Sequence, residues 1–134
     1  SADDIKQNID RFLVATRRDL VVGCGELARL SSTLSEVRSL VVAFDARGDG
    51  IGTGIIASLI SVGRRQNVTR LCAVTHVPHP FVALGFSIVP HTWLPEKIMT
   101  DCQECEWFRR CEQYAVVIEL NWGQSGPRGN ARTI

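Results

Sequence analysis

The sequence contains no apolar run of the roughly 20 residues that a membrane-spanning helix requires. Its opening stretch, SADDIKQNID, is polar and acidic, unlike a secretory signal peptide. It also lacks an excess of charge of one sign, because the formal net charge is only +1. That charge creates no overall field to attract nucleic acid or an acidic membrane. We therefore expect a cytoplasmic protein without membrane or nucleic-acid partners, in which any anion is bound by a local site.

A disulfide framework is lacking too, because the five cysteines are an odd number and no export signal is present. Three cysteines form the pattern Cys102-x-x-Cys105, followed by Cys111. Structural zinc usually takes two close pairs of ligands, and this pattern offers one. We therefore predict no metal site. Free thiols or a Cys102–Cys105 disulfide are expected instead, and a metal site of the three cysteines completed by His91 is the alternative.

The composition that is present is typical of a globular protein, with 45% hydrophobic and 22% charged residues in a chain of 134. This length suits one domain, and no internal repeat is visible. We expect the domain to cover residues 1–120. Residues 121–134 are rich in glycine, asparagine and arginine and have little to bury, so they are expected to form a flexible tail.

Hydrophobic periodicity predicts the elements at the start of the chain. Ile5, Ile9 and Phe12 stand at helical spacing and predict an amphipathic helix over residues 3–12. Two β-rich runs flank a short polar turn and predict a hairpin. These runs cover residues 12–16 and 20–30.

The following residues continue the pattern. Residues 36–44 form a β-rich run that becomes continuously apolar toward its end, which is typical of a central buried strand. The later elements are a helix beginning near Ile51, a buried strand over 69–75, a short helix over 78–85, a short strand over 86–90 and a final strand over 113–120. This order predicts an α/β or α+β fold with one mixed sheet.

Four glycines, at positions 48, 50, 52 and 54, stand between the apolar run and the predicted helix. N–H groups in the first turn of a helix have no partner within it, and the helix dipole makes their surroundings positive. Glycine lets the backbone approach a ligand closely and adopt a positive φ. The turn therefore predicts a phosphate site that needs no lysine or arginine.

Two common phosphate motifs do not fit these glycines. The dinucleotide pattern G-x-G-x-x-G has a different spacing, and no Gly-Lys-Ser/Thr closes a P-loop. A tight turn that binds nothing is the alternative interpretation.

The spacing Arg47-x-x-Gly50-x-Gly52 resembles the Arg/Gln-x-x-Gly-x-Gly/Ala motif of the GNAT superfamily of N-acetyltransferases. The wider run over residues 38–52 is also similar to that family, although Phe44 stands where the family often has proline. The resemblance extends from residue 3 to about residue 120. It implies a mixed central sheet flanked by helices, with acetyl-CoA as the cosubstrate.

The resemblance also implies roles for individual residues. In the family, this loop binds the pyrophosphate of acetyl-CoA, and the preceding strand pairs with the pantetheine through its backbone. The first role falls on Arg47, Gly48, Asp49, Gly50, Ile51, Gly52 and Thr53, and the second on Leu40, Val41 and Val42. Family members begin with a strand and a helix ahead of the first helix expected here, so the sequence is expected to lack that strand and helix.

Within the superfamily, the sequence most resembles short bacterial N-acetylglutamate synthase-like proteins. Residues 9–12 and 21–24 look like their opening helix and hairpin, and residues 35–40 look like their Ala-Glu-Ile-Arg-Ser-Leu strand. Residues 94–97 and the cysteine pattern resemble their C-terminal signature, although Glu106 replaces the usual proline. This resemblance implies a role in arginine biosynthesis.

Acetyl transfer needs a base that takes a proton from the attacking amine, directly or through water. Glu36 is the predicted base, because it starts the strand that leads to the glycine loop and matches the synthase-like strand. Thr75 ends the next strand, where the synthase-like group places a hydroxyl near the sulfur. An exposed strand-end carboxylate and a strand-capping hydroxyl are the alternative interpretations.

Other candidates for proton transfer are fewer. Many family members use a tyrosine on the short helix as a general acid, and this sequence has none there. Its single tyrosine, Tyr114, lies in the final strand and is expected to pack. His76 and His79 flank the corresponding region and could titrate near neutral pH, with simple exposure as the alternative.

The acceptor is predicted to be the amino group of a small molecule, with L-glutamate as the best guess. Arg38, Ser39 and Lys97 are the predicted acceptor-binding residues, and Arg109 and Arg110 are further cationic candidates, because arginine suits carboxylates. Solvent exposure is the alternative for each. A non-catalytic module that binds acyl-CoA or a partner is the alternative function. Homodimers are common in the family.

Overall fold

The computed structural model describes residues 4–9, 11–93 and 113–120. Their strands form one seven-stranded sheet. The elements are β1 (Asp4–Ile9), β2 (Phe12–Arg17), β3 (Leu20–Arg29), β4 (Leu34–Val42), α1 (Ile51–Arg65), β5 (Arg70–Thr75), α2 (His79–Ala83), β6 (Ser87–Val89) and β7 (Tyr114–Glu119), with short 3-10 turns at Phe44–Ala46 and His91–Trp93.

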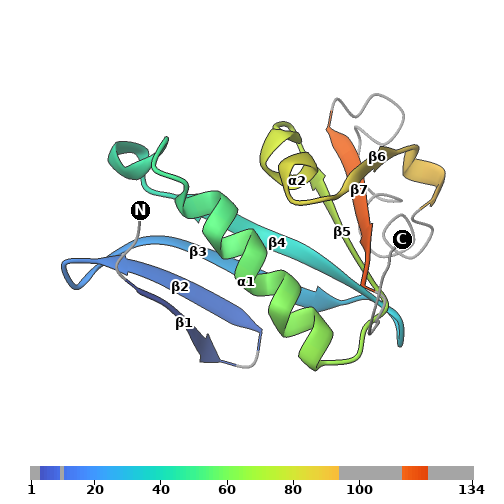
Figure 1. Cartoon of the computed structure of the whole chain (residues 1–134), viewed down its shortest axis with the longest axis horizontal. Helices are drawn as coiled ribbons and strands as arrows, with labels where there is room; N and C mark the ends of the chain where they lie inside the picture. The colour runs from blue at the N-terminus through green and yellow to red at the C-terminus, as the bar shows by residue number, and fades with distance from the viewer. Residues whose placement is uncertain (1–3, 10, 94–112, 121–134) are drawn as a thin grey trace.

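The order of strands in the sheet is β1-β2-β3-β4-β5-β7-β6. All neighbours are antiparallel except β4 and β5, which are parallel and joined through α1. Figure 1 shows β1 to β4 on one side of the molecule, β5 to β7 on the other, and α1 crossing the face of the sheet. The predicted mixed α/β fold is confirmed. Within the described residues, no helix has the length and apolar character of a membrane span.

Helix α1 contributes six of the 18 buried residues in the main hydrophobic core of the described structure. Its side chains Ile55, Ile56 and Leu59 are almost fully buried. The helix lies so close to β3 that a Cβ on Gly25 would come within 2.8 Å of Ile55 Cγ2. Glycine at this position therefore sets how closely α1 approaches the sheet beneath it.

The prediction of a helix over residues 3–12 is wrong. Residues 4–9 form β1, an edge strand that pairs antiparallel with β2, with Asp4 opposite Thr16. A spacing of four between Ile5 and Ile9 fits a helix, but four is also a multiple of the two-residue period of a strand. Pairing with the edge of β2 stabilises the strand, whereas an isolated helix of this length would be only marginally stable.

The other predicted elements are confirmed, with ends shifted by up to about two residues. In the hairpin between β2 and β3, Arg18 and Asp19 both have positive φ, at 52° and 66°. This is the backbone that tight two-residue hairpin turns require. The expected tail over residues 121–134 lies outside the described residues, and so do Lys97, Arg109, Arg110 and the three clustered cysteines.

Candidate active site

The central feature of the site is an opening between β4 and β5. These parallel strands are in register over three residue pairs, which are Leu34 with Arg70, Ser35 with Leu71 and Glu36 with Cys72. Figure 1 shows the two strands starting together beside the C-terminal end of α1 and then diverging. Beyond Glu36, β5 continues its pairing with β7 on its other side. The β5-facing backbone of the second half of β4 is therefore left without a strand partner in the described structure.

The prediction of a central buried strand holds for the position of β4 in the sheet and for its first half, but not for its apolar end. Its first residues, Leu34–Val37, are buried, whereas Leu40 and Val42 are half-buried and Val41 is 56% exposed. The reason is the divergence of β5, which covers only the beginning of β4. An apolar strand end with an unpaired edge is a surface that an extended, partly apolar ligand can occupy.

A β-bulge accompanies the opening. Between the pairs Cys24–Val41 and Glu26–Arg38, β3 advances by two residues and β4 by three. Within the bulge, Ser39 has a φ of 54°. A bulge inserts one unpaired residue and bends the strand that carries it. The bulge therefore re-aims the end of β4, where the strand leaves β5.

The N-terminus of α1 lies just beyond this strand end. The loop between them has Gly48 at a φ of 88° and Gly50, the residue before the helix, at 80°. Among the described residues no side chain caps the helix, and its first turn contains no acidic residue. The first bond of the helix runs from the N–H of Gly54 to the carbonyl of Gly50, at 2.9 Å. The helix geometry therefore leaves the N–H groups of the first three helical residues without a partner inside the helix.

The two glycines that precede the helix are not crowded. A Cβ added at Gly48 or Gly50 would meet no atom within 4 Å among the described residues. The positive φ values, and not crowding, are what require glycine here. A cluster of unpaired amides at an open helix N-terminus matches the predicted phosphate site.

Arg47 and Asp49, two of the three charged side chains of the loop, are both engaged. Arg47 donates from Nε to the carbonyl of Val42 at 3.3 Å, and its guanidinium lies 5.5 Å from the centre of the Phe44 ring. Asp49 accepts a charge-assisted bond from Nη2 of Arg17 at 2.8 Å. These contacts fasten the loop to the end of β4 and to the end of β2.

Glu36 stands where the registered pairing of β4 and β5 ends. Its residue is only 3% exposed, and Oε1 accepts a bond from Arg38 Nε at 2.6 Å. The alternative of an exposed strand-end carboxylate is therefore wrong. A buried carboxylate beside an arginine, next to an opening in the sheet, is a group that can exchange a proton with a bound amine.

Sequence reasoning missed a second buried carboxylate, that of Glu26 on β3, which is 7% exposed. It accepts bonds from Arg11 Nε at 3.0 Å and from Ser39 Oγ at 3.3 Å, and its residue is in register with Arg38. The available signal was a lone acid within the apolar stretch VVGCGELA. The site thus has two buried carboxylates on adjacent strands, each bonded to an arginine.

Thr75 ends β5 on the other side of the opening. Its hydroxyl donates to the carbonyl of Val77 at 3.2 Å and accepts the Val77 N–H at 3.0 Å, so it does cap the strand end. Tyr114 is opposite Thr75 on β7 and is 46% exposed, which does not fit the expectation that it packs. His76 and His79 are both exposed.

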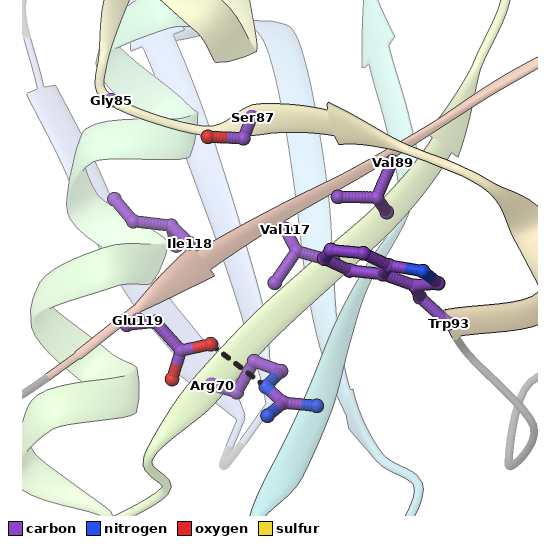
Figure 2. A pocket seen from close by; sticks show the side chains of 8 residues that line it. All are labelled: Arg70, Gly85, Ser87, Val89, Trp93, Val117, Ile118 and Glu119. Carbon is purple, nitrogen blue, oxygen red and sulfur yellow. Dashed lines mark hydrogen bonds and ion pairs between the residues drawn. The ribbon is translucent and has the colours of Figure 1, made fainter.

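A pocket of about 650 Å³ lies elsewhere, at the opposite end of β5. Figure 2 shows the Trp93 indole over Val117 and the ion pair between Arg70 and Glu119 at its rim. The distance of that ion pair is 3.0 Å. The pocket contains none of the loop amides and neither of the buried carboxylates, so we do not assign the acetyl-transfer chemistry to it.

Comparisons with known proteins agree with this geometry. An uncharacterized N-acetyltransferase from Chlorobaculum tepidum is 29% identical over 120 residues, which cover 90% of this chain and 77% of that protein. An amino-acid acetyltransferase from Mycobacterium tuberculosis is 29% identical over 133 residues, which cover 94% of this chain and 72% of that protein.

Solved structures share the fold. Rv2747 from Mycobacterium tuberculosis, solved in complex with CoA and a second ligand, has a TM-score of 0.68 and 26% identity, and the match covers 83% of this chain and 76% of that one. N-acetylglutamate synthase from Neisseria gonorrhoeae has a TM-score of 0.69 at 22% identity, covering 83% of this chain and 26% of that one. Residues 2–86 also match the model of the family described as "Acetyltransferase (GNAT) family". The chain therefore belongs to the GNAT family of acetyltransferases.

Proposed function

We propose that this protein, an N-acetyltransferase by family, transfers the acetyl group of acetyl-CoA directly to the amino group of a small molecule, with L-glutamate as the best candidate. The observation that carries the proposal is the pairing of two features, an opened edge on β4 and an uncapped helix N-terminus beyond it. The opened strand edge can pair with an extended chain that carries amides, and the helix N-terminus can bind a diphosphate. Acetyl-CoA, the family's cosubstrate, has both parts in this order.

For the cofactor, we assign the pyrophosphate to the loop over residues 47–53. The backbone amides of Gly50, Ile51, Gly52 and Thr53 supply the hydrogen bonds, and Gly48 and Gly50 supply the backbone conformation. The backbone of Leu40, Val41 and Val42 would pair with the pantetheine. Arg47 and Asp49 contribute indirectly, because their side-chain contacts hold the loop in place.

For the chemistry, we assign the base to Glu36. Its burial and its position at the last registered β4–β5 pair support this role, because the thioester would lie in the opening immediately beyond. Proximity and a correctly placed base can supply much of the acceleration in such a reaction. Thr75 is proposed as the hydroxyl beside the sulfur, held in orientation by its bonds to Val77.

For the acceptor, the proposal of glutamate rests on the resemblance to synthase-like proteins and on the amino-acid acetyltransferase that is 29% identical over 94% of this chain. Arg38 and Ser39 lie on β4 in contact with the two buried carboxylates, and they are the proposed acceptor contacts within the described residues. Lys97 is a proposed contact outside them. A glutamate acceptor would place the protein in arginine biosynthesis.

The test has two measurements. Calorimetry with CoA measures cofactor binding, and thiol release from acetyl-CoA measures transfer with L-glutamate, L-glutamine and other amines. Saturable CoA binding and glutamate-dependent release would support the full proposal. Release with another amine only would overturn the glutamate assignment. Tight CoA binding without release for any amine would favour the alternative, a non-catalytic module that binds acyl-CoA.

A further inference from the structure

The loop that we assign to the pyrophosphate contains a carboxylate, and the structure pairs it with a distant arginine. Asp49 precedes Gly50, the residue at the entrance of α1. Its Oδ2 accepts a bond of 2.8 Å from Nη2 of Arg17, which lies 32 residues earlier in the chain. Arg17 is the last residue of β2, at the hairpin turn. The pair is partly exposed, with side-chain exposures of 28% for Arg17 and 47% for Asp49.

An acid at this position opposes phosphate binding in two ways. Its charge repels a diphosphate at the same helix end. It is also a competitor for the site, because carboxylates at a helix entrance are attracted to the exposed amides and readily cap them. In this structure Asp49 does not do so, since no side chain makes a capping bond to α1.

We infer that Arg17 is a positioning residue for the cofactor site: it neutralises Asp49 and holds its carboxylate off the helix amides, which leaves them available for the diphosphate. The inference rests on the proposed function. It adds a residue from the β2–β3 hairpin to a site otherwise built from β4, the glycine loop and α1. Arg17 acts through Asp49 in this proposal and does not contact the cofactor.

The test is a double-mutant cycle on CoA affinity, measured by calorimetry. Arg17→Gln leaves the carboxylate of Asp49 without this partner, and the dissociation constant of CoA should rise about five- to tenfold. Asp49→Asn removes the competing charge, and CoA should bind about two- to threefold more tightly. The double variant removes both groups, and its affinity should return to within about twofold of the wild type.

Salt gives a second readout that a purely structural role would not move. Because the defect of Arg17→Gln is electrostatic, its ratio to the wild type should shrink to within about twofold in 1 M NaCl, where screening acts over about 3 Å. Arg64→Gln is the matched control. It removes the same charge from an exposed position at the other end of α1 and should leave CoA affinity within about twofold of the wild type.

Two results would overturn the inference while the proposed function stands. One is that the Arg17→Gln variant binds CoA with the same dissociation constant as the wild type. The other is a double variant as weak as Arg17→Gln, which would mean that Arg17 contacts the cofactor itself or only supports the hairpin. Failure of the wild-type protein to bind CoA would overturn the proposed function and this inference together.

Discussion

The two ends of α1 and of its neighbouring strands are built in opposite ways. At the closed end, β4 and β5 are in register, and the N–H groups of Gln66, Asn67 and Val68 donate bonds to carbonyls in the last turn of α1, those of residues 62, 63 and 64. Arg64 and Arg65 place positive charge near the negative end of the helix dipole. At the open end, the strands diverge and the helix has no capping side chain.

The difference shows where this fold secures its stability and where it leaves groups for a ligand. A helix end gains stability from capping, typically about 1 kcal/mol for a good side-chain cap at the N-terminus. The open end forgoes that gain, and its first N–H groups have no partner inside the helix, next to a strand edge that is unpaired within the described structure. If the open end is the cofactor site, substitutions there should change CoA binding and catalysis. Substitutions at the closed end should change the free energy of unfolding.

The largest effect is expected from Glu36, at the boundary between the two ends. Glu36→Gln removes the proposed base, so kcat for thiol release should fall about 100- to 1,000-fold. The dissociation constant of CoA should change by less than about twofold, because Gln keeps the shape of the side chain. Glu119→Gln, at an exposed carboxylate of the closed end, is the control and should retain wild-type kcat. A kcat within tenfold of the wild type for Glu36→Gln would contradict the assignment.

The next largest effect is expected at the open end of α1. Gly50→Ala places a methyl group in open space at a φ of 80°, where an alanine costs about 1–2 kcal/mol of strain. The methyl group and the relaxed backbone both disturb the amides. We expect the dissociation constant of CoA in calorimetry to rise at least about tenfold. Unchanged affinity would move the diphosphate elsewhere.

The same substitution at the closed end should have the opposite profile. A Cβ at Gly63 would lie 3.1 Å from Leu120 Cδ1 and 3.2 Å from Leu71 Cδ2. The crowding outweighs the gain in helix propensity, so Gly63→Ala should lower the free energy of unfolding by about 1 kcal/mol in urea denaturation. The folded protein should bind CoA with wild-type affinity, and a tenfold loss would show that the two ends are not separable.

An effect of similar size but opposite sign is expected from Ser35, also at the closed end. Its hydroxyl is fully buried and has no hydrogen-bond partner in the described structure. Ser35→Ala removes an unsatisfied polar group, which should raise the free energy of unfolding by about 1 kcal/mol. Thermal denaturation would register this as a higher midpoint, and a lower one would mean that the hydroxyl has a partner in solution.

The smallest effect is expected from the ion pair between Arg70 and Glu119. Both side chains are about half exposed, at 45% and 56%, so solvent screens their attraction. A double-mutant cycle with Arg70→Gln and Glu119→Gln should give a coupling free energy below about 0.5 kcal/mol in urea denaturation. A coupling above 1 kcal/mol would show that the closed end depends on charge as well as on packing.

Features of the site that depend on local backbone could be predicted from the sequence. The glycines at 48 and 50 adopt the positive φ that their spacing suggested, and the helix begins at Ile51 as its periodicity indicated. Glycine conformation and helix periodicity are properties of a few consecutive residues. The family resemblance depended on the same residues, and the comparisons confirm it.

Features of the site that depend on neighbouring strands could not be predicted from the sequence. Residues 3–12 fit two periods, and only the edge of β2 decided in favour of a strand. The apolar end of β4 is exposed because β5 diverges from it. The residues of β4 themselves do not specify where the pairing with β5 ends. The buried Glu26 on β3 is held by Ser39 from β4 and by Arg11 from the turn before β2, and only the folded sheet brings these residues together.

The sequence by itself therefore determined the glycine loop, the helix that follows it and the family, because each is encoded in short, contiguous patterns. The tertiary structure alone decided which strand edge opens, which carboxylates are buried and that Arg17 reaches Asp49 across 32 positions of the chain. The physical reason is that pairing, burial and ion pairs between distant residues depend on how the strands meet in space, and local propensities do not specify that meeting.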